Sequence, residues 1–174
     1  MTGFSLYLVT LLLGTRVPGA VVAPVTPPAH IVVTQARQLS GDEQRLFNLV
    51  NTERAKEDLP ELKINPMLVR IAREHSREMF EKDYFDHVSP TDEIRTPKDR
   101  YLKGLGHTPA WACIAENLFY SSVVDADLGH KCLMQSTPHR TNILNDQFSE
   151  FGVGVYESPD GRFWVTQMFL TQID

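Results

Sequence analysis

The spacing of apolar residues changes along this chain, and that change limits the folds open to it. In several stretches between residues 40 and 144 they recur every three or four positions, as in helices with one buried face. In 151–155 and 163–168 they alternate instead, as in strands, and the Ser-Pro-Asp-Gly turn at 158–161 separates the two runs. Helices followed by a β-hairpin predict an α+β fold or a layered helix–sheet–helix sandwich.

Two helix starts are marked by their capping residues. Ser40 and Glu43 form a capping box, and apolar residues at helical spacing follow it to about residue 58. Asn65 followed by Pro66 marks the second start, and this helix is expected to run to about Lys82. Shorter helices are expected within the ranges 96–106, 123–134 and 136–144.

The first 38 residues are expected to lie outside the folded domain. An apolar run from Phe4 to Leu13 fits the core of a secretory leader, and it is shorter than the roughly 20 residues that span a membrane. No Lys or Arg precedes the run, so a buried strand or helix is the alternative. We expect a leader over 1–20, a Pro-rich linker over 21–38, a domain over 39–174, and a secreted or cell-envelope location.

Length indicates one domain, and charge argues against one class of partner. The chain has 174 residues, enough for one domain with a substantial core. It carries 17 Lys and Arg against 22 Asp and Glu, a net charge of −5, without a basic stripe. A protein that binds the phosphate backbone needs clustered positive charge, so nucleic acid is not an expected partner.

The chain has two cysteines, Cys113 and Cys132. In an exported protein an even pair favours one disulfide bond. The alternative is two free thiols that pack as small apolar side chains. The pair lacks the C-x-x-C spacing of a cysteine metal site.

Three residues are the candidates for chemistry. His87 and His139 lie outside the periodic stretches or at a helix start, whereas His75 shares an apolar helix face and is interpreted as a core residue. Glu116 is an isolated acid in an otherwise uncharged run, which favours a buried or cleft position. Two imidazoles and one carboxylate are the minimum for a three-ligand divalent metal site. The same trio could act as acid, base and orienting group.

Four motifs, in order, resemble the CAP superfamily of cysteine-rich secretory, antigen 5 and pathogenesis-related 1 proteins. The segments 49–54 and 65–76 are also similar, and the likeness spans Leu39 to Phe169 and is greatest to the bacterial SCP-like branch. The motifs are FDHVSP at 85–90, AENL at 115–118, STPHRTNIL at 136–144 and FGVGV at 151–155.

The resemblance implies a three-layer α-β-α sandwich with a central antiparallel sheet, and secretion. It also implies an open cleft of two His and acidic residues, which binds zinc or another divalent ion in some members. Matched by motif, His87 and His139 are the cleft histidines and Glu116 is the first acid. Animal and plant relatives have a second Glu before the second His, where this chain has no carboxylate over 132–136.

Two functions follow as expectations. The first is a secreted binding module for a lipid, peptide, glycan or partner protein, favoured by the missing second acid. The alternative is a metal-assisted hydrolase that uses His87, His139 and Glu116, with Glu116 as the base. A Ser89 nucleophile paired with His87 ranks last, because no oxyanion loop is evident.

Three further polar residues of the motifs have structural interpretations. Asn117 and Asn142 are expected to hold loops through hydrogen bonds to the backbone. Arg140 is expected to pair with a nearby acid, with an anionic ligand as the alternative.

Overall fold

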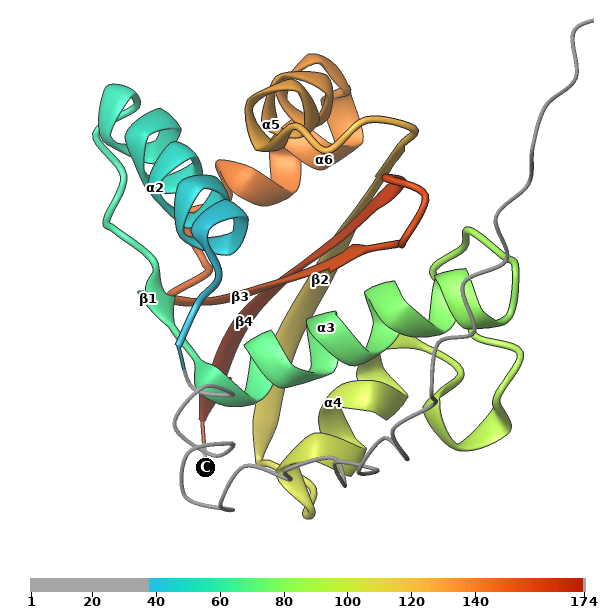
Figure 1. Ribbon diagram of the computed structural model, residues 1–174. Helices are drawn as coiled ribbons and strands as arrows, with labels where there is room; N and C mark the ends of the chain where they lie inside the picture. Colours follow the sequence, from blue (N-terminus) through green and yellow to red (C-terminus); the bar gives the residue numbers. More distant parts are fainter. Residues whose placement is uncertain (1–37, 174) are drawn as a thin grey trace, which may run out of the picture.

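A computed structural model describes residues 38–173 of the chain (Figure 1). Its sheet has four strands in the order β1-β3-β4-β2: β1 Lys63–Ile64, β2 Trp111–Ser121, β3 Glu150–Glu157 and β4 Phe163–Ile173. The helices are α2 Gly41–Lys56, α3 Pro66–Glu81, α4 Pro97–Leu105, α5 Ala126–Gln135 and α6 Thr137–Ile143, with a 3-10 turn η1 at Asp92–Ile94.

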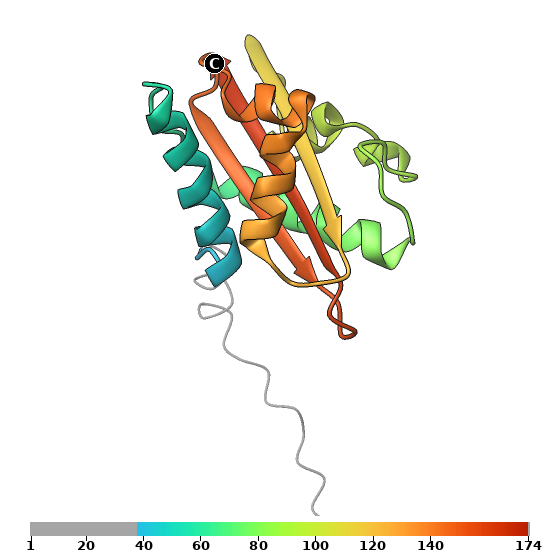
Figure 2. The ribbon, with the colours of Figure 1, turned by 90° about the horizontal axis from the view of Figure 1, so that it is seen from above.

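The helices cover the two faces of the sheet as separate layers. Helices α2, α5 and α6 lie on one face, and α3 and α4 lie on the other (Figures 1 and 2). Alternation along β4 divides its side chains between the two, since Phe163, Val165 and Phe169 join the first core while Met168 and Leu170 join the second. The α-β-α sandwich predicted from the sequence is therefore confirmed.

Strand β3 shows why the alternating segment at 151–155 fits this layering. Phe151 and Val153 are fully buried against the α2 layer. Gly152 and Gly154 face α3, whose backbone approaches so closely that a Cβ on Gly154 would lie 2.0 Å from the nitrogen of Arg73. The missing side chains let α3 lie directly on the sheet, and this contact fixes the helix that precedes the His87 loop.

The structure differs from the sequence prediction mainly in the sheet. Strand β2 was not predicted, although it pairs with β4 along its whole length. Strand β1 pairs with β3 in parallel, so the sheet is antiparallel in its other two pairings but mixed as a whole. Helix α5 begins at Ala126 rather than near residue 123, because the side chain of Asp125 accepts a hydrogen bond from the nitrogen of Leu128 and caps the helix there.

The two cysteines are free thiols, so the expected disulfide bond is not formed. Cys113 is half-buried against the α2 layer, whereas Cys132 is exposed on α5. The alternative of two free thiols describes the structure, although only Cys113 packs as an apolar side chain.

The predicted leader over 1–20 and all but the last residue of the linker over 21–38 lie outside the described residues. Among residues 38–173, no helix combines the length and the apolar character needed to cross a membrane.

The close approach of α3 to β3 yields a stability prediction. Gly154→Ala should destabilise the fold by at least about 3 kcal/mol, since the new methyl group would overlap the α3 backbone and neither backbone can move freely. Gly41→Ala is the control, because its Cβ would meet nothing within 4 Å, and it should change stability by less than about 0.5 kcal/mol. Urea unfolding measures both, and equal stability of the two variants would contradict the packing.

Candidate functional site

The structure brings two of the three candidate residues into direct contact. His87 lies in the loop after α3, and its Nδ1 donates a hydrogen bond of 2.8 Å to Oε1 of Glu116 on β2. The Glu116 side chain is 1% exposed, whereas the His87 side chain is 49% exposed. A buried carboxylate therefore holds one nitrogen of a solvent-facing imidazole and leaves Nε2 available to a ligand.

Arg100 of α4 supplies the charge that balances Glu116. Its Nη2 lies 2.6 Å from Oε2 of Glu116, and both side chains are buried. The same nitrogen donates to the carbonyl of His87 at 3.1 Å, and Nη1 donates to the carbonyl of Ile94 at 3.1 Å. Arg100 thus holds both the carboxylate and the backbone of the loop that carries the histidine.

A second buried carboxylate, Glu78 of α3, anchors the same loop. Burial raises its pKa, but hydrogen bonds from Thr91, Lys82, Tyr84 and Ser89 outweigh burial and lower the pKa to about 2. The oxygens of Glu78 accept hydrogen bonds from Ser89 Oγ at 2.9 Å, Thr91 Oγ1 at 2.6 Å, Lys82 Nζ at 2.9 Å and the Tyr84 hydroxyl at 2.8 Å.

His75 lies beneath the contact between His87 and Glu116. It is buried, as the sequence predicted, but its Nε2 is 3.9 Å from Oε1 of Glu116. Burial lowers its pKa, which favours the neutral ring. The apolar helix face correctly indicated burial but gave no sign that His75 packs against the site.

His139 lies in the opposite helical layer, next to the strand that carries Glu116. It lies on α6, and its carbonyl accepts a hydrogen bond of 3.2 Å from Nδ2 of Asn117, the residue after Glu116. Asn142 of α6 donates to the side-chain oxygen of Asn117 at 2.8 Å and to the carbonyl of Glu116 at 3.4 Å. Both asparagines bond to the backbone as expected, but they join α6 to β2 rather than holding loops.

The pKa values of the two imidazoles are shifted in opposite directions. The hydrogen bond to Glu116 raises the pKa of His87, against an opposing effect of burial. Burial lowers the pKa of His139, and the positive charge of His87 lowers it further. The two shifts therefore favour the charged form of His87 and the neutral form of His139.

The residues do not fit a three-ligand metal site. Oxygen Oε1 of Glu116 accepts from His87 and Oε2 accepts from Arg100, so the carboxylate is an outer partner of His87 rather than a free ligand. Within residues 38–173, no group of three or more His, Cys, Asp or Glu side chains could hold a metal ion. His87 and His139 would supply two imidazoles, fewer than the three protein ligands of catalytic zinc sites.

Two further expectations have clear outcomes. Ser89 is buried, and its Oγ donates to Glu78 and accepts from the nitrogen of Thr91, so it supports the loop and does not face His87 as a nucleophile. Arg140 pairs with Glu57 at 3.1 Å on the surface, as expected.

Sequence reasoning did not identify Arg100 and Glu78 as site residues. Both lie within amphipathic helices among other charged residues, where nothing in the spacing separates a buried charge from a solvated one.

The pKa of Glu78 predicts acid-dependent stability. A carboxyl whose folded pKa lies below its unfolded value stabilises the fold above the unfolded pKa, and this contribution falls as the pH drops toward the folded pKa. At pH 7 the free energy of unfolding of the wild type should therefore exceed that of Glu78→Gln by on the order of 2–3 kcal/mol. This difference should shrink between pH 4.5 and about 2. Thermal unfolding from pH 7 to pH 3 measures the change.

The control for Glu78 is Glu74→Gln on the same helix. Glu74 pairs with Arg70 on the surface, and both side chains are more than half exposed, so its removal should leave the acid dependence unchanged. A pH-independent difference between wild type and Glu78→Gln would contradict the carboxylate's role.

The buried ion pair predicts non-additive mutations. Arg100→Met should destabilise the fold by about 3–5 kcal/mol, because it leaves the buried charge of Glu116 without its cation. The double variant with Glu116→Gln should recover part of this loss. As a control, Arg70→Met removes an exposed ion pair and should lower the free energy of unfolding by less than about 1 kcal/mol. A double-mutant cycle by urea unfolding measures the coupling, and additive effects would show that the two side chains act independently.

Comparison with known proteins places this architecture in a family. The model of the CAP family, described as the cysteine-rich secretory protein family, matches residues 47–169. The protein YkwD of Bacillus subtilis is 36% identical over 149 residues, which cover 85% of this chain and 54% of YkwD. The chain thus spans about half of that relative.

Two solved structures share the fold. An extracellular protein of Bacillus anthracis that contains an SCP domain is 31% identical, with a TM-score of 0.66 over 87% of this chain and 45% of that protein. NaASP2, crystallised with Zn²⁺, is 12% identical with a TM-score of 0.54, over 75% of this chain and 80% of NaASP2. The family match covers the site residues and most of the sheet that carries them. This chain belongs to the CAP, or cysteine-rich secretory protein, family.

Proposed function

We propose that this chain is an extracellular binding module in which His87 and His139 contact the polar group of a ligand. The location is supported by the relative from Bacillus anthracis, which is described as extracellular. The ligand is a lipid, peptide, glycan or protein that presents an anionic oxygen at this site.

The observation that carries the proposal is the fixed but exposed ring of His87. A buried side chain contributes to packing and a mobile surface side chain loses entropy when it binds, but His87 is half exposed and already held at Nδ1 by Glu116. Its raised pKa favours a charged Nε2–H donor, which suits a carboxylate or phosphate oxygen. His139, with its lowered pKa, supplies a neutral partner nearby.

The proposal predicts pH-dependent anion binding at the two rings. Acetate and inorganic phosphate serve as minimal probes, followed by vesicles of anionic lipid and soluble acidic glycans. At pH 6 they should shift the imidazole ¹⁵N resonances of His87 and His139. The affinity should fall about tenfold as the pH rises through the raised pKa of His87, because the ring loses its proton and a charge-assisted hydrogen bond is lost.

Matched variants separate the site from the rest of the surface. His87→Gln and His139→Gln should each weaken binding, whereas His107→Gln in the exposed loop after α4 should not. Saturable binding that survives His87→Gln, or no saturable shift with any probe, would overturn the proposal.

The metal-assisted hydrolase remains the alternative, with the Zn²⁺ in the NaASP2 crystal as the observation in its favour. It is supported less well, since both oxygens of Glu116 are engaged and two imidazoles bind a divalent ion weakly. Metal analysis of the purified protein distinguishes the two: a stoichiometric ion that is lost in His87→Ala and His139→Ala would favour the alternative.

A further inference from the structure

We propose that the outer edge of β2, between Ala112 and Ile114, binds an extended peptide through main-chain hydrogen bonds. The pocket beside this edge would receive an apolar side chain of the peptide. This site lies on the same strand as Glu116 but does not include His87 or His139, so the proposal stands apart from the binding role of those rings.

The register of the sheet shows which main-chain groups face outward. The carbonyl of Leu170 accepts a hydrogen bond from the nitrogen of Ser149, so the main-chain groups of the even-numbered residues of β4 face β3. The main-chain groups of its odd-numbered residues therefore face β2. The main-chain groups of Cys113 and Ala115 therefore bond to their partners on β4. The main-chain N–H and C=O groups of Ala112 and Ile114 point outward, away from β4. Within residues 38–173, no hydrogen bond satisfies the outward N–H and C=O groups of those two residues.

Two other parts of the sheet edge are protected. Strand β1 at the far edge has only two residues, and short edge strands pair poorly with other chains. On β2, the carbonyl of Glu116 already accepts from Asn142, and residues 116–118 are buried. The segment 112–115 is half-buried and contains neither a charged residue nor a proline, either of which would discourage strand pairing.

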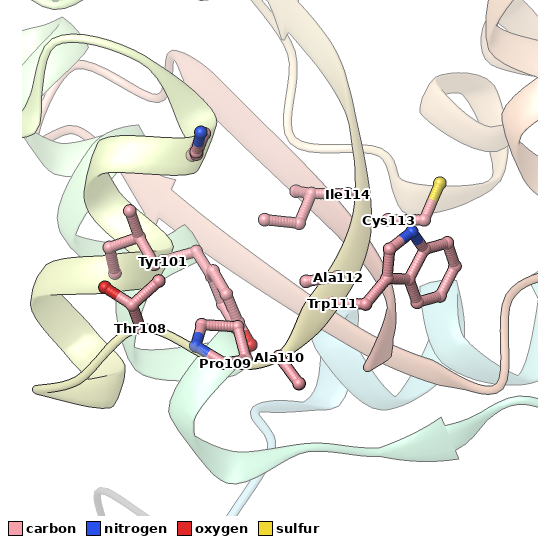
Figure 3. A pocket seen from close by; sticks show the side chains of 10 residues that line it. Tyr101, Thr108, Pro109, Ala110, Trp111, Ala112, Cys113 and Ile114 are labelled. Atoms are coloured by element: carbon pink, nitrogen blue, oxygen red, sulfur yellow. The ribbon is translucent and has the colours of Figure 1, made fainter. Parts of the chain in front are cut away.

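A pocket of about 450 Å³ adjoins this open segment, between α4 and the start of β2. Figure 3 shows Tyr101 of α4 facing Ala112 and Ile114 across it, while Trp111 and Cys113 point to the other side of the strand. Leu102, Thr108, Pro109, Ala110 and Lys98 complete the lining.

The combination of edge and pocket specifies an extended peptide. A lipid chain or other apolar ligand would fill the pocket but leave the outward peptide groups of Ala112 and Ile114 unpaired. A peptide strand pairs with them and places alternate side chains on one face, so that one apolar side chain enters the pocket. Lys98 is exposed at the pocket and favours an acidic residue next to that side chain.

The test uses the full chain and a hexapeptide, acetyl-Val-Glu-Val-Thr-Val-Thr-amide, as the probe. Binding should shift the backbone amide resonances of Ala112 and Ile114 and slow their hydrogen exchange at least tenfold. The same peptide with N-methyl groups on alternate residues should bind at least tenfold more weakly, because it cannot pair with the edge. This comparison needs no change to the protein.

A pair of variants adds a second readout. Ala112→Pro removes an outward N–H that no strand of the sheet uses, and it should weaken peptide binding, whereas Ala112→Ser keeps that N–H and should not. Equal binding of the N-methylated peptide, or shifts confined to residues away from β2, would overturn the proposal. A dimer that protects Ala112 and Ile114 without peptide would also overturn it, by identifying a second copy of the chain as the occupant.

Discussion

The buried ion pair between Glu116 and Arg100 determines how the rest of this site is built. A carboxylate that is 1% exposed requires a buried cation and well-placed hydrogen bonds, and Arg100 provides these from a helix 16 positions earlier in the chain. Because Arg100 also binds the carbonyl of His87, one guanidinium aligns β2, α4 and the histidine loop. The exposed ring of His87 is therefore held by charges that water does not reach.

The fold was predictable where packing repeats along the sequence. The large and small residues of 151–155 alternate because one face of β3 meets the α2 layer and the other meets the backbone of α3. The capping residues Ser40 and Asn65 begin α2 and α3 where predicted, since their side chains accept from helix nitrogens. Strand β2 was missed because its polar residues, Glu116 and Asn117, are buried by partners far away in the sequence and break the apolar alternation.

The site was predictable only in part, for a related reason. Unusual local context identified His87, Glu116 and His139, because each stands apart from the apolar pattern around it. The residues that hold them do not stand apart. Arg100 and Glu78 occupy ordinary positions in charged helices, and burial arises only when α3, α4 and β2 meet. His75 had the opposite problem, since its apolar helix face correctly indicated burial but concealed its position 3.9 Å from Glu116.

The position of the site at a sheet edge explains how two helical layers can share it. Glu116 points toward α3 and α4, while Asn117, the next residue, points toward α6, because side chains alternate along a strand. An edge strand is the place where both directions meet solvent. The loop of His87 therefore adjoins β2 from one layer, and the helix of His139 adjoins it from the other. On the same edge, Asn142 occupies the outward carbonyl of Glu116, whereas the outward main-chain groups of Ala112 and Ile114 have no partner within residues 38–173.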